Sequence, residues 1–147
     1  MNKVTDFSAV LAESALKYVQ VYKGKTVVIK FGGELVAQDS VMRNLMRQAI
    51  HLKALGAKVV LVHGGGTQIT DELAKAGIES KIIGGFRFTT QEALDITHRC
   101  LNELNRRIVN IFHEEVARME VDVAAIGLGG LDGKLVIADT LYDEQDR

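Results

Sequence analysis

The stretch Val59–Leu73, VVLVHGGGTQITDEL, decides how this chain of 147 residues folds. It begins with β-branched and aliphatic residues, which favour a buried strand, and it ends with apolar residues at helical spacing. Three glycines, Gly64, Gly65 and Gly66, separate the two patterns. Glycine is costly to order, so three in a row indicate a loop whose backbone itself has a role. The stretch predicts a strand, a glycine loop and a helix.

A second arrangement of this kind precedes it. Residues 26–31, TVVIKF, form another short apolar run, which Gly32 and Gly33 end. A helical pattern with Asp39 or Ser40 as N-cap follows, and it is closed by Gly56 before the next strand. Two buried strands joined by a helix are typical of a parallel sheet.

The rest of the chain extends this order of elements. We expect helices over about 6–22, 68–76 and 91–119, short strands or a hairpin over 81–90, and two further strands over 121–128 and 133–139. The fold class is therefore α/β: a three-layer αβα sandwich with an open, mainly parallel sheet covered on both faces, in a single domain over residues 1–147.

Composition narrows the class of protein. Lys and Arg number 18 against 19 Asp and Glu, and this balance argues against a nucleic-acid-binding surface. The sequence has neither an apolar run of the ~20 residues that a membrane span needs nor a signal-peptide pattern. The single cysteine, Cys100, cannot form a disulfide within the chain, so we expect a reducing compartment, the cytoplasm.

Both glycine loops follow strands, at the edge where open α/β sheets bind ligands. A glycine loop that leads into a helix presents free N–H groups to an anion, and Lys30 adds a positive charge beside Gly32. This equipment suits a phosphoryl group in transfer. Neither loop is a Walker loop or a dinucleotide fingerprint, and a tight turn is the competing interpretation of each.

Other polar residues have simpler explanations. Arg87, between two phenylalanines, either points to solvent or binds a carboxylate through its planar guanidinium. His63 is expected to bond the loop backbone, and Cys100 is expected in the core. The helix charges are expected on a solvated face: Arg99, Glu103, Arg106, Arg107, Glu114 and Glu115. Asp132 and Asp139 are expected in turns.

Several motifs together resemble the amino acid kinase family and, within it, the acetylglutamate kinases. They are YKGKTVVIKFGG, VVLVHGGG, GGFRFTTQEALDI, CLNELNRRIV and GLGGLDGKLVIAD, which span most of the chain. The Lys-x-Gly-Gly element alone is shared by several kinases of the superfamily. The His-Gly-Gly-Gly element followed by Gly-x-Arg-x-Thr favours acetylglutamate kinases.

The resemblance implies an activity: ATP phosphorylates the side-chain carboxylate of N-acetyl-L-glutamate, and the acyl phosphate serves arginine synthesis. Mg²⁺ accompanies ATP, and no protein residue is identified as a metal ligand. The implied roles are catalytic for Lys30, phosphate-binding for Gly32, Gly33 and Gly64, and substrate-binding for Gly65, Gly66 and Arg87. The implied partners are the two substrates and further copies of the chain in a homo-oligomer, at least a dimer, with an N-terminal helix that either covers the domain or joins dimers.

The sequence departs from the family pattern in three places. Thr67 stands where proline is frequent, and Asn105-Arg106 stands for the usual Asn-Lys. The half that carries the ATP site in the family is not in this sequence, which indicates either the amino-terminal part of an enzyme or a short relative. We expect the chain alone to have little kinase activity and to expose a sheet edge and an apolar face.

Two other functions stay open at this point. A kinase of aminoadipate or of a carrier-linked amino acid would use the same chemistry. A regulatory module that binds an amino acid without catalysis would retain the loops and need no ATP half.

Overall fold

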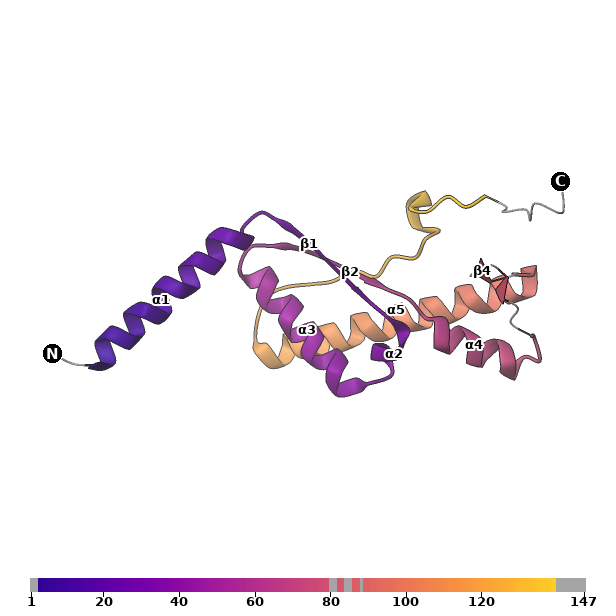
Figure 1. Ribbon diagram of the computed structural model, residues 1–147, viewed down its shortest axis with the longest axis horizontal. Coiled ribbons are helices and arrows are strands. Elements are labelled where there is room, and N and C mark those ends of the chain that lie inside the picture. Colours follow the sequence, from indigo (N-terminus) through magenta and orange to yellow (C-terminus); the bar gives the residue numbers. More distant parts are fainter. Residues whose placement is uncertain (1–2, 80–81, 84–85, 88, 140–147) are drawn as a thin grey trace.

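The computed structural model describes residues 3–79, 82–83, 86–87 and 89–139, with the backbone course alone for 3–9, 11, 82–83 and 86–87. Figure 1 shows the order of the elements along the chain. They are α1 (Lys3–Tyr22), β1 (Thr26–Phe31), α2 (Gly33–Val36), α3 (Asp39–Ala54), β2 (Lys58–His63), α4 (Gly66–Lys75), β3 (Ile82–Ile83), β4 (Phe86–Arg87), α5 (Gln91–Met119) and the 3-10 turn η1 (Asp132–Lys134).

The two long strands are parallel, as the sequence predicts. β1 pairs with β2 from Thr26 opposite Lys58 to Phe31 opposite His63. The predicted hairpin is also confirmed, because β3 and β4 pair antiparallel with Ile82 opposite Arg87. Because β1 and β2 are parallel, their carboxyl ends lie at the same edge of the sheet, and α2 and α3 form the connection between the strands.

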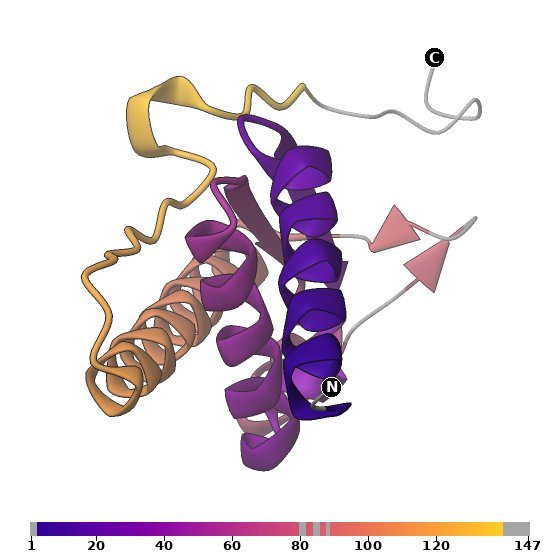
Figure 2. The same ribbon diagram turned by 90° about the vertical axis from the view of Figure 1, so that its left-hand side faces the viewer.

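The helices α3, α4 and α5 build the core on one face of the strands, where Figure 2 shows α3 and α5 together. The buried side chains include Met42, Met46, Ile50, Leu73, Ile108 and Phe112. Thr90 caps α5, because its Oγ1 accepts a hydrogen bond of 3.2 Å from the N–H of Ala93. Gly56 and Gly77 follow α3 and α4 with φ of +86° and +72°, which confirms both as helix-ending glycines.

The predicted α/β class with a parallel sheet is confirmed, but the expected third layer is wrong for the described residues, which form two layers. Along β1 and β2 the side chains alternate, and those that face away from the helices are exposed: Val28 by 62%, Val60 by 45% and Val62 by 43%. The reason is that α3, α4 and α5 all pack on the same side of the sheet. The apolar face expected to be exposed is therefore present.

The expected strands over 121–128 and 133–139 are also wrong, although part of their pattern is real. Val121, Val123 and Ala125 are partly buried against the core and alternate with exposed neighbours, as in a strand. Among the described residues they join no strand ladder, and the N–H of Ala125 is bonded instead to His113 of α5, at 3.3 Å. The Asp132-Gly133 pair forms the turn η1, with Gly133 at φ +59° and Asp132 accepting from the N–H of Gly129 at 2.6 Å.

The helix α1 projects from the body of the molecule (Figure 1), and its apolar residues Leu16, Tyr18 and Val21 are more than half exposed. Within the described part of the chain, no helix is long and apolar enough to cross a membrane. The core expectation for Cys100 is confirmed, since its side chain is buried and burial raises the pKa of its thiol.

One charged residue of α5 departs from the expected solvated face. Glu115 is 1% exposed, and its carboxylate joins α5 to α3 through Arg43, at 3.0 Å, and Arg47, at 3.2 Å. Arg118 closes the group at 2.6 Å. A buried carboxylate needs such partners, because without them its desolvation is costly. Burial acts to raise the pKa of Glu115, and the hydrogen bond from Arg43 with the nearby guanidinium charges lowers it overall.

Candidate active site

The two glycine loops meet at the carboxyl ends of β1 and β2. The N–H of Gly64 donates to the carbonyl oxygen of Phe31 at 3.3 Å. A Cβ placed on Gly33 would lie 3.0 Å from the Cα of Gly65 and 3.3 Å from the carbonyl oxygen of Gly64. The loops are thus in backbone contact, and we call Gly32–Gly33 with Gly64–Gly66 the glycine cradle.

The five glycines of the cradle have two different environments. Gly33 and Gly65 are buried, and a Cβ on Gly65 would lie 2.7 Å from Leu104 Cδ1 of α5. Gly32, Gly64 and Gly66 have open space, with nothing within 4 Å of a built Cβ. The first pair allows the loops to approach each other and α5, and the other three leave the outside of the loops accessible to a ligand.

Backbone donors are available at the start of α4. The first backbone hydrogen bond of this helix runs from the N–H of Ile69 to the carbonyl oxygen of Gly65, at 2.8 Å. Gly65 is the N-cap and has no side chain to bond the first turn. Among the described residues, the N–H groups of Gly66, Thr67 and Gln68 have no backbone acceptor. Such groups at the positive end of a helix dipole favour an anion.

Lys30 lies one residue before the end of β1, opposite Val62 in the ladder, and its residue is exposed. None of the ion pairs among the described residues involves it. The side chain starts from the open face of the sheet, next to the loop of Gly32. The structure therefore leaves this ammonium available to a ligand at the strand ends.

His63 has a structural role, as the sequence suggests. Its ring stacks on that of Phe31, with centroids 6.2 Å apart, and its Nδ1 lies 3.3 Å from the carbonyl oxygen of Gly64. Phe31 and His63, the last pair of the β1–β2 ladder, therefore both contact Gly64 of the cradle.

Arg87 lies in β4, next to Phe86, and the position of its side chain is outside the described parts of the structure. Its clamp role stays a prediction. Lys30 and the five glycines lie at the strand ends described above.

Sequence reasoning missed Gln68, which joins the two loops. Its Nε2 donates to the carbonyl oxygen of Gly33 at 2.7 Å. Its Oε1 is buried and has no hydrogen-bond partner among the described residues. The available signal was its place as the third residue of α4, where glutamine is a frequent capping residue.

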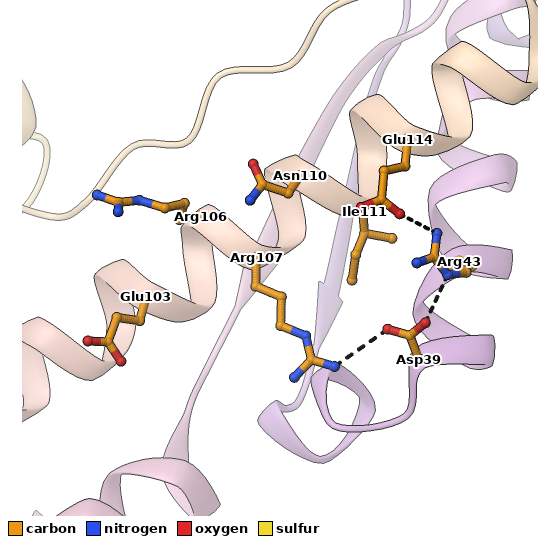
Figure 3. Close-up of a pocket in the computed structure, with 8 residues that line it drawn as sticks. All are labelled: Asp39, Arg43, Glu103, Arg106, Arg107, Asn110, Ile111 and Glu114. Carbon is orange, nitrogen blue, oxygen red and sulfur yellow. Dashed lines mark hydrogen bonds and ion pairs between the residues drawn. The ribbon is translucent and has the colours of Figure 1, made fainter.

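A shallow pocket of about 370 Å³ lies between α3 and α5, and its lining residues, drawn in Figure 3, include no glycine of the cradle. Its charges are largely matched: Arg43 pairs with Asp39 at 2.8 Å and Glu114 at 2.7 Å, and Arg107 lies 3.5 Å from Asp39. Charges that are already paired offer a ligand little, so this pocket is a weaker candidate site than the cradle. No group of three His, Cys, Asp or Glu side chains suited to a metal ion occurs in the described ranges.

Comparison with known proteins shows the family of this chain. Residues 25–137, which include the whole cradle, match the family model described as the amino acid kinase family. The chain is 38% identical over 148 aligned positions to the acetylglutamate kinase of Nitrosococcus oceani, covering 100% of this chain and 47% of that protein. It is 41% identical over 125 positions to the acetylglutamate kinase of Methanoculleus marisnigri, with coverage of 84% and 41%. The chain spans about half the length of the curated relatives it matches.

Solved structures agree on the fold. N-acetylglutamate synthase from Neisseria gonorrhoeae, complexed with coenzyme A and N-acetyl-glutamate, superimposes with a TM-score of 0.60 at 21% identity, covering 78% of this chain and 26% of that chain. Its complex with coenzyme A and L-arginine gives 0.59 at 20% identity, with 87% and 28% covered. With the family model matching 113 of its 147 residues, from 25 to 137, this chain belongs to the amino acid kinase family.

Proposed function

We propose that this chain supplies the amino-acid and phosphoryl side of an acetylglutamate kinase. ATP transfers its γ-phosphoryl group to the side-chain carboxylate of N-acetyl-L-glutamate and an acyl phosphate forms. The observation that carries the proposal is the contact between the two glycine loops, with their open glycines outward, in a member of this family. The identity of its relatives as acetylglutamate kinases supports the choice of substrate.

The chemistry needs positioning and charge rather than a base. One carboxylate oxygen attacks the γ-phosphorus, an O–P bond forms, and the bond from that phosphorus to the bridging oxygen of ADP breaks. A glutamate side chain is already ionised at neutral pH, with an unperturbed pKa of about 4.3, so no proton has to be removed. His63 is therefore free for its structural place under Gly64, and no general base is required.

We assign the following roles to Lys30, the glycines and Arg87. Lys30 neutralises the transferring phosphoryl group, and Gly32, Gly33 and Gly64 lie against the phosphates. Gly65 and Gly66 give the N–H groups that hold the reacting carboxylate, and Arg87 binds the α-carboxylate. Mg²⁺ arrives with ATP, since it is bound mainly by phosphate oxygens and water in such sites, and we assign it no protein ligand.

We place the protein in the cytoplasm and expect it to form a homo-oligomer. The exposed side chains of Val28, Val60 and Val62 leave an apolar face that association would cover. Equilibrium sedimentation of the purified chain tests this expectation, and a single monomeric species up to high concentration would remove it.

Calorimetry tests the proposed substrate. The chain is titrated with N-acetyl-L-glutamate, free L-glutamate, 2-aminoadipate and ATP with Mg²⁺. We expect N-acetyl-L-glutamate to bind with the highest affinity among the amino acids and Arg87→Ala to abolish that binding. Preference for a free amino acid favours the regulatory module, and preference for aminoadipate favours the second kinase.

A further inference from the structure

Gln68 connects the two halves of the glycine cradle. It belongs to the first turn of α4, which begins at Gly66, but its side-chain Nε2 donates to the carbonyl oxygen of Gly33 in the other loop, at 2.7 Å. This is a hydrogen bond across 35 positions of sequence. We propose that Gln68 is a positioning residue, which sets the phosphate loop at Gly33 relative to the carboxylate loop at Gly65. The inference rests on the proposed function.

The bond holds a peptide group, not only a carbonyl oxygen. A trans peptide is planar, so fixing the carbonyl of Gly33 also fixes the N–H of Glu34 on the other side of the same peptide. A cradle that stabilises a transferring phosphoryl group works through donors placed before the reaction begins. Rotation of this peptide would change the course of the loop that Lys30 precedes.

The environment leaves Gln68 one orientation. A Cβ on Gly33 would clash with Oε1 of Gln68, so the amide packs directly against the loop. That Oε1 is buried without a hydrogen-bond partner among the described residues, which is a costly state for an acceptor. Turning the amide over would place the oxygen against the oxygen of Gly33 and lose the bond as well. The side chain therefore keeps the hydrogen bond from Nε2 to Gly33, although Oε1 is left without a hydrogen bond among the described residues.

The variants separate positioning from folding. Gln68→Met keeps the length of the side chain and removes the donor. Gln68→Glu keeps the shape, and its carboxyl group donates to Gly33 only when protonated. Gln48→Met is the matched control, since Gln48 is exposed on α3 and, among the described residues, its side chain bonds within its own helix, to Asn44 at 3.5 Å. Thermal unfolding of all three gives the stability against which binding is compared.

The experiment measures the dissociation constants of two probes for the full chain, Mg²⁺-tripolyphosphate and N-acetyl-L-glutamate, by calorimetry at pH 7.5 and pH 5. We expect Gln68→Met to weaken tripolyphosphate binding about tenfold, which corresponds to about 1.4 kcal/mol. N-acetyl-L-glutamate binding stays within about twofold, and Gln48→Met leaves both unchanged. For Gln68→Glu, the loss relative to wild type is smaller at pH 5 than at pH 7.5. The amide ¹⁵N resonance of Glu34 shifts in Gln68→Met, as a direct reading of the lost bond.

Each contrary result has a separate meaning. Unchanged binding of both probes in Gln68→Met overturns the positioning role, and so does an equal loss for both probes with lowered stability, which is a folding effect. A Gln68→Glu loss that does not depend on pH also contradicts it. Wild-type protein that binds neither probe contradicts the proposed function itself.

Discussion

Gly33 and Gly65 lie in backbone contact, since a Cβ on Gly33 would come within 3.0 Å of the Cα of Gly65. The contact joins the loops after β1 and β2 into one cradle. It also explains why these two glycines are buried while Gly32, Gly64 and Gly66 face open space. Glycine therefore has two uses at this edge of the sheet, packing and access, and the two uses predict different effects of alanine.

The packing glycine is tested by Gly65→Ala. The new Cβ would lie 2.7 Å from Leu104 Cδ1 and 3.0 Å from Leu101 Cδ2, so α5 or the loop must shift. Overpacking of this kind costs about 2 kcal/mol, and we expect the free energy of unfolding to fall by that amount. Urea denaturation measures it, with Gly64→Ala as control. Equal stability of the two variants would show that Gly65 is not needed for packing.

The access glycine is tested by Gly66→Ala, for which stability and binding move in opposite directions. Gly66 begins α4 and its Cβ would meet nothing within 4 Å, so alanine raises the free energy of unfolding by about 0.5 kcal/mol. The same methyl group occupies the space proposed for the ligand, and we expect N-acetyl-L-glutamate to bind at least about tenfold more weakly, or about 1.4 kcal/mol. Denaturation and calorimetry on one preparation give both values. Unchanged affinity would move the carboxylate away from Gly66.

Lys30→Met tests the proposed charge at the strand end. The residue is exposed and makes no ion pair among the described residues, so its removal changes the free energy of unfolding by less than about 0.5 kcal/mol. Binding of tripolyphosphate is expected to weaken and to lose part of its salt dependence. Lys58→Met, at the opposite end of the paired strands, is the control. Equal effects of the two variants would mean that only net charge matters.

Glu115→Gln tests the stability of the protein outside the cradle. Replacing Glu115 by glutamine removes the charge that holds Arg43, Arg47 and Arg118 together. Because Arg47 and Arg118 are partly in water, we expect a loss of about 2 kcal/mol, below the full cost of breaking a buried pair. Glu114→Gln is the control, since Glu114 is 52% exposed and should cost below about 1 kcal/mol. Similar losses in both would place the stabilisation at the surface.

Glu115 also predicts how the free energy of unfolding falls at acidic pH. The pKa of Glu115 is lowered in the folded protein, so its contribution is complete above the unfolded pKa of about 4.3 and is lost as pH falls through the folded value. Glu115→Gln should therefore flatten the fall in unfolding free energy below about pH 4.3. Denaturation curves from pH 7 to pH 3 measure this, and an unchanged acid limb would assign it to other carboxylates.

Turnover is a separate test of the chain by itself. One lysine and two glycine loops are few groups for the charge of a triphosphate, so we expect almost no phosphorylation of N-acetyl-L-glutamate by ATP. A coupled assay for ADP measures it. A substantial rate from the purified chain would contradict this expectation.

Local patterns predicted much of the fold and the cradle. The glycines and Lys30 were found because a strand, a glycine break and a helix follow one another in the letters. The strands over 121–128 and 133–139 were wrong because alternation does not supply a neighbouring strand, and the N–H of Ala125 bonds to His113 instead. Gln68 and Glu115 were missed because their partners lie 35 and 72 positions away. Nothing in the letters separates Glu115 from its neighbour Glu114, and the packing of α3 decides which is buried.

The most direct measurement of the central claim is an NMR titration of the ¹⁵N-labelled chain with N-acetyl-L-glutamate. We predict that the amide resonances of Gly64, Gly65 and Gly66 shift with one binding curve, followed by those of Gly32 and Gly33. The amide resonances of the pocket residues Arg107 and Asn110 on α5 should not shift, and they serve as the internal control. Shifts at the pocket with an unmoved cradle, or no shifts at saturating ligand, would contradict the account.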